Sequence, residues 1–190
     1  MIKLSDSSFE EYAKWYIKRE ICKSNETNFS ETEDYVSILK ERHSGKVWDG
    51  IEEYIWTIQE LNKGEVESLL VLASKWTKEE KLVIDDKPRI LSNAVEQAIK
   101  HDYFKSSSEK RARHIDYYEK MKGGTFDLSN EKIVIRSLFE NEQNYLKEYP
   151  ETECNYYLHD GIGRMLPYMT LVKLGKITFK PVVAFVAHKS

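Results

Sequence analysis

The stretch that decides the fold is YYLHDGIGRMLPYMTLVKLGKITFKPVVAFVA, residues 156–187. It begins within an expected strand at 154–158, and the run HDGIGR follows this strand as a loop. Apolar residues then recur at helical spacing over 165–174, and a glycine follows them as a typical helix end. A proline opens the run VVAFVA, which predicts a final strand over 181–187. The pattern therefore predicts strand, loop, helix and strand, with the helix beginning within two residues of Arg164.

The residues upstream continue this alternation of strand and helix. Ile133, Val134 and Ile135 are consecutive and β-branched. Such a run is typical of a strand buried on both faces, and it predicts a strand at 132–137. A helical pattern follows over 139–149. Strands separated by connections of this kind favour parallel pairing through right-handed crossovers.

The N-terminal part of the chain shows mainly helical periodicity. Aromatic residues recur at helical spacing over 9–16, and an amphipathic pattern over 51–58 predicts another helix. No internal repeat or long linker is visible, so we expect a single domain over 1–190. Its portion 1–124 would be mainly helical, and its portion 125–190 would carry the strands and the loop. The expected fold class is α/β, or α+β, with a helical N-terminal half packed on a small mixed sheet.

The composition argues against several classes of protein. The chain has 29 Lys and Arg and 32 Asp and Glu, a net charge of −3, which gives no general attraction to nucleic acid. Cys22 and Cys154 form no metal-ligand spacing, and two cysteines fit a reducing cytoplasm better than an oxidised framework. We find neither a secretory signal nor an apolar run of the roughly 18 residues that a membrane span needs. We therefore expect a soluble cytoplasmic protein with no membrane contact; its oligomeric state stays open.

The loop itself carries the candidate site, which comprises Asp160, Gly161, Ile162, Gly163 and Arg164. Glycine permits a close backbone approach, and the start of the following helix offers unpaired N–H groups and a partial positive charge. The arginine adds a guanidinium fork that suits phosphate, and the aspartate is placed to accept a proton or orient a metal. The alternative is a tight turn in which Asp160 caps the helix and Arg164 pairs with a nearby carboxylate.

Two further residues are candidates for the same site. His159 adjoins Asp160, but in a regular strand its side chain would point to the opposite face, which favours a structural role. Arg113 lies in a basic stretch over 105–122 that is either a solvated helix face or a supplement to Arg164 at a phosphate. The histidines show no zinc-ligand spacing, so we expect no protein-held metal.

The segment from Tyr156 to Ala187 resembles the second half of the ParB/sulfiredoxin-like fold, in which a strand, a D-G-x-H-R or G-E-R-R type loop, a helix and a Pro-Val strand follow one another. The resemblance covers about residues 131–188, with weaker support over 113–127. Members of this fold include a CTP-dependent DNA-segregation protein, an ATP-dependent sulfinic-acid reductase and kinases acting on free serine. The resemblance implies nucleotide phosphate binding at the loop. Gly163 departs from the pattern, because many members have a histidine there.

Two functions follow from the loop and the resemblance. The first is a phosphotransferase that uses ATP or another nucleotide, with Mg²⁺, to phosphorylate a small hydroxylated metabolite. Arg164 and the loop amides would neutralise charge, and Asp160 would orient or deprotonate the acceptor hydroxyl. The alternative is a non-enzymatic nucleotide-binding regulatory or protein-interaction module of the same fold.

Overall fold

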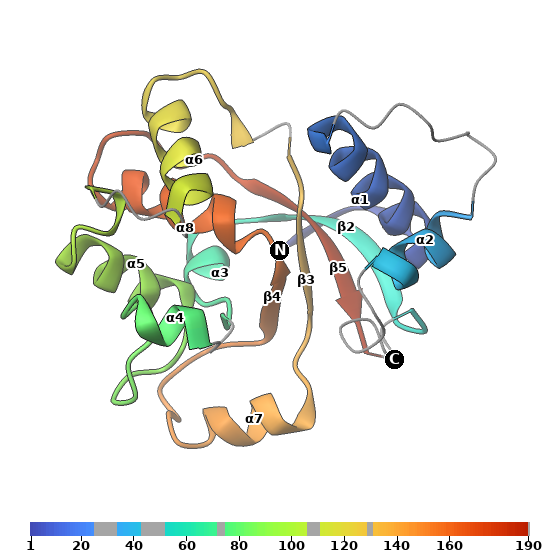
Figure 1. Ribbon diagram of the computed structural model, residues 1–190. Coiled ribbons are helices and arrows are strands. Elements are labelled where there is room, and N and C mark those ends of the chain that lie inside the picture. The colour runs from blue at the N-terminus through green and yellow to red at the C-terminus, as the bar shows by residue number, and fades with distance from the viewer. Residues whose placement is uncertain (25–33, 43–51, 72–74, 106–110, 129–130, 190) are drawn as a thin grey trace.

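A mixed sheet forms the centre of the molecule (Figure 1). The computed structural model describes residues 1–24, 34–42, 52–71, 75–105, 111–128 and 131–189. Over these residues the strands are β1 (Ile2–Ser7), β2 (Ile55–Leu61), β3 (Ile133–Ser137), β4 (Tyr156–Asp160) and β5 (Val182–His188). The helices are α1 (Phe9–Ser24), α2 (Tyr35–Arg42), α3 (Lys63–Glu67), α4 (Lys75–Glu79), α5 (Leu91–Lys100), η1 (Tyr103–Lys105), α6 (Ala112–Lys122), α7 (Glu140–Leu146) and α8 (Ile162–Lys173). The sheet order is β1-β2-β5-β3-β4, so the last strand of the chain lies in the middle.

The sheet has a hydrophobic core on each face. Along β5, Ala184 and Val186 pack with α5, α6 and α8, whereas Phe185 and Ala187 pack with α1 and α2. Figure 1 shows these two groups of helices on opposite sides of the sheet. Successive side chains of a strand point to opposite faces, so a strand covered on both sides needs an unbroken apolar run. The α/β or α+β class expected from the sequence is consistent with this arrangement.

The C-terminal elements agree with the sequence-based expectation. The strands predicted at 132–137, 154–158 and 181–187 correspond to β3, β4 and β5, and α8 begins at Ile162, two residues before Arg164. Every residue of α8 from Arg164 to Leu171 is buried, because the helix lies between the sheet and the helices α5 and α6. The start of α8, and the loop before it, are therefore held by packing on several sides.

The prediction of parallel pairing is wrong for one pair of strands. β3 is parallel to β5, with Ile133 opposite Ala184, but β3 is antiparallel to β4. The reason lies in the connection between them. The helix α7 lies beyond the end of the sheet and turns the chain back, instead of crossing over a face of the sheet (Figure 1). Parallel neighbours need a crossover that returns the chain to the same end of the sheet.

The helix predicted over 51–58 is also wrong, because Ile55–Leu61 forms β2. Trp56 packs toward α1, while the buried Thr57 and Gln59 point to the other face and contact the ring of His188. The alternation of apolar and polar residues in β2 extends only from Trp56 to Gln59, and the helical spacing over 51–58 was the longer pattern in the sequence. The first 124 residues thus contribute two strands, β1 and β2, as well as helices. Among the described helices, none is both long and apolar enough to cross a membrane.

Candidate functional site

An irregular residue pairing at the end of β4 determines the face of the sheet to which the Asp160 side chain points. In the β3–β4 pairing Leu158 lies opposite Ile135 and Asp160 lies opposite Val134, so β4 has one extra residue, His159, at this point. Ile135 faces the core that contains α8, and Val134 faces the core that contains α1. In a regular strand Leu158 and Asp160 would share a face. The extra residue turns Asp160 toward α1 instead, as bulges do near sheet ends.

Asp160 there meets two guanidinium groups. Its Oδ2 accepts a hydrogen bond of 2.9 Å from Nη2 of Arg164 and lies 3.0 Å from Nη1 of Arg19. Arg164 is only 3% exposed, and its Nη1 donates to the carboxylate of Glu131. The arginine expected to face a phosphate is therefore shared between two carboxylates. Its first role is to tie the end of β4, the start of α8 and the segment before β3 together.

The side of the cluster that faces α1 is aromatic. The guanidinium carbon of Arg19 lies 4.6 Å from the ring centroid of Trp15 and 4.8 Å from that of Tyr16. Burial, together with the Asp160 carboxylate, raises the pKa of Tyr16 to about 12 and that of Tyr12 well above its usual value. Burial by itself would lower the pKa of Arg19, but Asp160, together with Glu20 and Tyr16, more than offsets this and the net shift is upward. The cluster thus keeps neutral phenols and a charged guanidinium around the carboxylate.

Gly161 makes the turn from β4 into α8. Its φ is +120°, a conformation that side chains with a Cβ rarely adopt, and an added Cβ would lie 2.8 Å from Cγ2 of Ile133. The carbonyl of Gly161 accepts the amides of Arg164 and Met165 at 2.9 and 2.8 Å. The amides of Ile162 and Gly163 lie in the first turn of α8, before the first residue whose amide bonds within the helix, so they have no acceptor there. Glycine is therefore required at this position by the backbone and by the packing together.

A hollow of about 150 Å³ is lined by the residues that carry these amides, Ile162 and Gly163. One side consists of the loop from Asp160 to Arg164, and the other consists of α6, through Arg113, His114 and Tyr117. The ring of His114 is buried, and an added Cβ on Gly163 would lie 3.3 Å from its Nε2. Its Nδ1 lies 3.0 Å from the hydroxyl of the buried Tyr103. Burial, with a contribution from Arg113, lowers the pKa of His114 to about 4, so the imidazole is neutral at pH 7.

The structure brings most of the predicted residues together. The loop 160–164 and Arg113 line one hollow, whereas His159 is not among its lining residues and has its ring 6.5 Å from that of Tyr157. Three further members, Arg19, Glu131 and His114, were not predicted. The helical spacing of Arg19 with Trp15 and Tyr16 was visible in the sequence, but nothing local relates it to Asp160.

The charges of the cluster balance, and Arg113 is the lining cation that is available to an anion. Arg19, Arg113 and Arg164 supply three positive charges, and the carboxylates of Asp160, Glu131 and Glu20, the last 3.4 Å from Arg19, supply three negative ones. Arg113 is exposed and bears a guanidinium that forms no ion pair with any described residue. No group of three or more His, Cys, Asp or Glu within the described part of the chain is arranged to hold a metal ion. Asp160 alone would offer one carboxylate to a cation that arrives with a phosphate.

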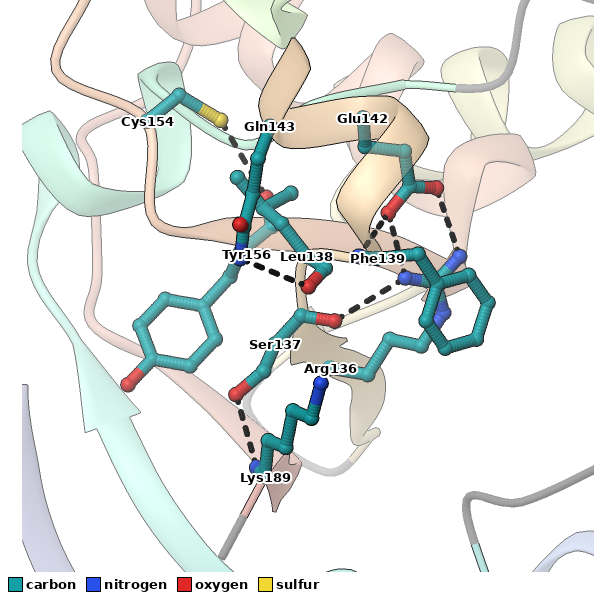
Figure 2. Close-up of polar contacts among 9 residues, drawn as sticks. All are labelled: Arg136, Ser137, Leu138, Phe139, Glu142, Gln143, Cys154, Tyr156 and Lys189. Carbon is teal, nitrogen blue, oxygen red and sulfur yellow. Dashed lines mark hydrogen bonds and ion pairs between the residues drawn. The ribbon is translucent and has the colours of Figure 1, made fainter.

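A second buried arginine lies at the opposite end of the β3–β4 pair (Figure 2). Arg136 is 5% exposed and donates two parallel hydrogen bonds, of 2.7 and 2.8 Å, to Glu142 of α7. Glu142 also accepts the amide of Phe139 at 2.8 Å, which caps the start of α7. The guanidinium carbon lies 3.6 Å from the ring centroid of Phe139 and 4.3 Å from that of Tyr157.

Comparison with known proteins adds no family to this description. No protein-family model, no curated protein and no solved structure matches the chain.

Proposed function

We propose that the hollow between the DGIGR loop and α6 binds the phosphate end of a nucleotide. One observation carries this proposal: the loop 160–164, Arg113 and His114 line a single hollow at the start of α8. The N-terminus of a helix presents N–H groups and a partial positive charge to an anion. A volume of about 150 Å³ suits a phosphate group but not a whole nucleotide, so the base and ribose would lie outside.

Arg113 and Arg164 have different roles in this proposal. Arg164 is buried and already paired with two carboxylates, so it holds the loop in shape. Arg113 is exposed and borders the same hollow, so it is the cation that would contact the phosphate directly. The order β3, α7, β4, loop, α8, β5 also supports the assignment of the C-terminal part to a ParB/sulfiredoxin-like fold, which we retain as part of the proposal.

Within this proposal, the pairing of Asp160 favours a nucleotide-binding regulatory module. A bare carboxylate beside bound phosphate would repel it. Here the charge of Asp160 is matched by Arg19 and Arg164, so the residue adds little repulsion and has a structural task. Binding therefore explains every member of the site without requiring a reaction.

A phosphotransferase is the second candidate, and one observation supports it. The Asp160 side chain is 28% exposed and lines the hollow, so an acceptor hydroxyl beside the phosphate could reach it. In such a reaction the acceptor oxygen bonds to the terminal phosphorus, the bond from that phosphorus to the bridging oxygen breaks and the nucleoside diphosphate leaves, while Asp160 takes the hydroxyl proton. Mg²⁺ bound to the phosphates would supply charge neutralisation.

The binding proposal is tested with ATP, CTP and ADP by isothermal titration calorimetry. We expect Arg113→Gln to weaken nucleotide binding by about tenfold or more, the scale of one charge-assisted hydrogen bond. Lys120→Gln removes the same charge from an exposed position of the same helix, and its affinity should match that of the wild type. Equal affinities for wild type and Arg113→Gln, or the absence of any nucleotide binding, would refute the assignment of this hollow.

Turnover separates the two candidates. The wild type is incubated with nucleotide and a mixture of small hydroxylated metabolites while nucleotide consumption is followed. For a phosphotransferase, Asp160→Asn should retain nucleotide but lower turnover by at least about 100-fold. Binding without turnover in the wild type supports the regulatory module. Turnover that survives Asp160→Asn would remove this residue from the chemistry.

A further inference from the structure

A second hollow, of about 200 Å³, lies between α7 and the segment that covers the free side of β4. The covering segment is held by hydrogen bonds from the amide of Leu70 to the carbonyl of Tyr156, at 2.9 Å, and from the amide of Leu158 to the carbonyl of Leu70, at 2.8 Å. The polar and aromatic side chains that line the hollow are Arg89, Asn141, Glu142, Tyr145 and Tyr157. None of them belongs to the loop site.

Both the backbone and the guanidinium group of Arg89 are held by neighbouring residues. Its carbonyl accepts the amide of Val71 at 2.8 Å, and its amide donates to the hydroxyl of Tyr145 at 3.1 Å. Its guanidinium carbon lies 4.2 Å from the ring centroid of the same tyrosine. A cation stacked on an aromatic face keeps its N–H edges available for a planar acceptor. The side chain is therefore organised before any ligand arrives.

The charge of Arg89 is not balanced by its neighbours. No carboxylate among the described residues forms an ion pair with it, and its buried Nε has no acceptor there. Glu142 borders the same hollow, but both of its oxygens accept hydrogen bonds from Arg136, and one also accepts the Phe139 amide (Figure 2). The Arg136–Glu142 pair is neutral as a unit. The hollow consequently has an excess of one positive charge.

Two further donors border the hollow. The side-chain amide of Asn141 and the hydroxyl of Tyr157 form no hydrogen bond with another residue in the described ranges. The phenol stays protonated, because burial raises the pKa of Tyr157 to about 12. Leu70 and Val71 add an apolar wall beside these groups. An unpaired guanidinium, an amide, a phenol and an apolar wall thus meet in one small space, as in sites that bind small molecules.

We infer that this hollow binds a small organic carboxylate, with the carboxylate on Arg89 and the carbon skeleton against Leu70 and Val71. A planar carboxylate matches the guanidinium fork. One excess positive charge matches a monoanion, whereas a phosphate dianion would carry uncompensated charge beside Glu142. The volume lies below the roughly 300–1,000 Å³ of pockets for drug-sized ligands, so the ligand is small. This site is independent of the function proposed for the loop.

The test is NMR titration of the whole chain with benzoate, with benzamide as its neutral counterpart and with inorganic phosphate. The Nε–Hε resonance of Arg89 reports directly on the guanidinium. We expect benzoate to shift this resonance and the backbone amides of Asn141 and Tyr145 saturably. Benzamide and phosphate should each bind at least about tenfold more weakly, the factor that one charge-assisted contact provides.

Matched variants complete the experiment. Arg89→Gln should weaken benzoate binding at least about tenfold, while Lys87→Gln, an exposed neighbour, should leave it unchanged. Asn141→Ala, on the exposed side of α7, should weaken it by a smaller factor. The inference fails if benzoate causes no saturable shift in the wild type, if benzamide or phosphate binds equally well, or if Arg89→Gln binds benzoate like the wild type. If Arg89→Gln does not fold, the wild-type titrations with benzoate, benzamide and phosphate still test the inference.

Discussion

The two ends of the β3–β4 pair each carry a buried arginine, and they use it differently. At one end Arg136 gives both of its terminal nitrogens to a single carboxylate, Glu142. At the other end Arg164 is divided between Asp160 and Glu131, and Asp160 is shared in turn with Arg19. The first arrangement is a closed pair that caps a helix. The second is an extended cluster of several shared charges beside a hollow.

This difference separates a structural ion pair from a candidate site. A buried pair with matched charges has no net charge to offer a ligand, and breaking it leaves an uncompensated charge. A cluster with several members tolerates the loss of one contact, because the others remain. The four predictions below test the comparison between the Arg136 pair and the Arg164 cluster.

The largest effect is expected at the closed pair. Glu142→Gln should lower the free energy of unfolding by about 3 kcal/mol, because Arg136 keeps its charge in a buried position without a counter-ion. Nucleotide affinity at the loop should stay unchanged. Urea denaturation measures the free energy of unfolding, and calorimetry measures the nucleotide affinity. Glu140→Gln on the exposed side of the same helix is the control, within about 0.5 kcal/mol of the wild type.

Acid should destabilise the loop end through His114. The pKa of this group is about 4 in the folded protein and 6.5 when unperturbed, chiefly because of burial. Between these values the unfolded chain binds more protons, so the free energy of unfolding falls as the pH is lowered from 6.5 to 4, by up to about 3 kcal/mol. Above pH 6.5 the full stability is present.

Urea denaturation across this pH range, compared with His114→Gln, isolates the contribution of His114. In the variant, the free energy of unfolding should lose most of its dependence on pH between 6.5 and 4. The pKa of His188 is also lowered, mainly by burial, so part of the acid sensitivity should survive in the variant with the same sign. A wild type and a variant with identical pH profiles would show that His114 does not titrate as described.

The two loop glycines should behave differently. Gly161→Ala imposes a Cβ at positive φ and against Ile133, and should cost about 2 kcal/mol of stability. Gly163→Ala meets only the ring of His114 at 3.3 Å and should cost less than about 1 kcal/mol. The second change narrows the hollow, so it should reduce nucleotide affinity in a folded protein. Thermal unfolding and calorimetry on both variants provide the measurement, and equal costs would contradict the geometry.

The smallest change in stability is expected for Asp160→Asn. Arg164 keeps Glu131 as a partner, and asparagine can still accept one hydrogen bond, so the loss should be about 1 kcal/mol. This is well below the value expected for Glu142→Gln, and urea denaturation of both proteins compares them directly. If the two substitutions cost the same, the charge at the loop is not shared in the way the contacts indicate.

Local patterns in the sequence were sufficient for much of the C-terminal part. The β-branched run near Ile133, the helical spacing after Arg164 and the Pro-Val start of β5 gave their elements nearly the correct bounds. The glycine required at position 161 also followed from the loop pattern, because a turn from strand to helix leaves few backbone choices. These features depend on residues that are close together in the chain.

Long-range pairing was beyond the reach of the same reasoning. The antiparallel partner of β3, the strand character of β2 and the extra residue that turns Asp160 toward α1 all depend on neighbours far away in the sequence. The alternation in β2 covers only Trp56 to Gln59, so the longer helical spacing over 51–58 led to the prediction of a helix there.

The sequence by itself determined the order of elements from β3 to β5 and the five residues of the loop. The tertiary structure alone decided that Arg164 would be buried between two carboxylates, that Arg19 would join Asp160, and that His114 would stand against Gly163. The physical reason is the distance along the chain over which each effect acts. Backbone preference and side-chain periodicity act over a few residues, whereas charge pairing and burial depend on which distant segments the packed core brings into contact.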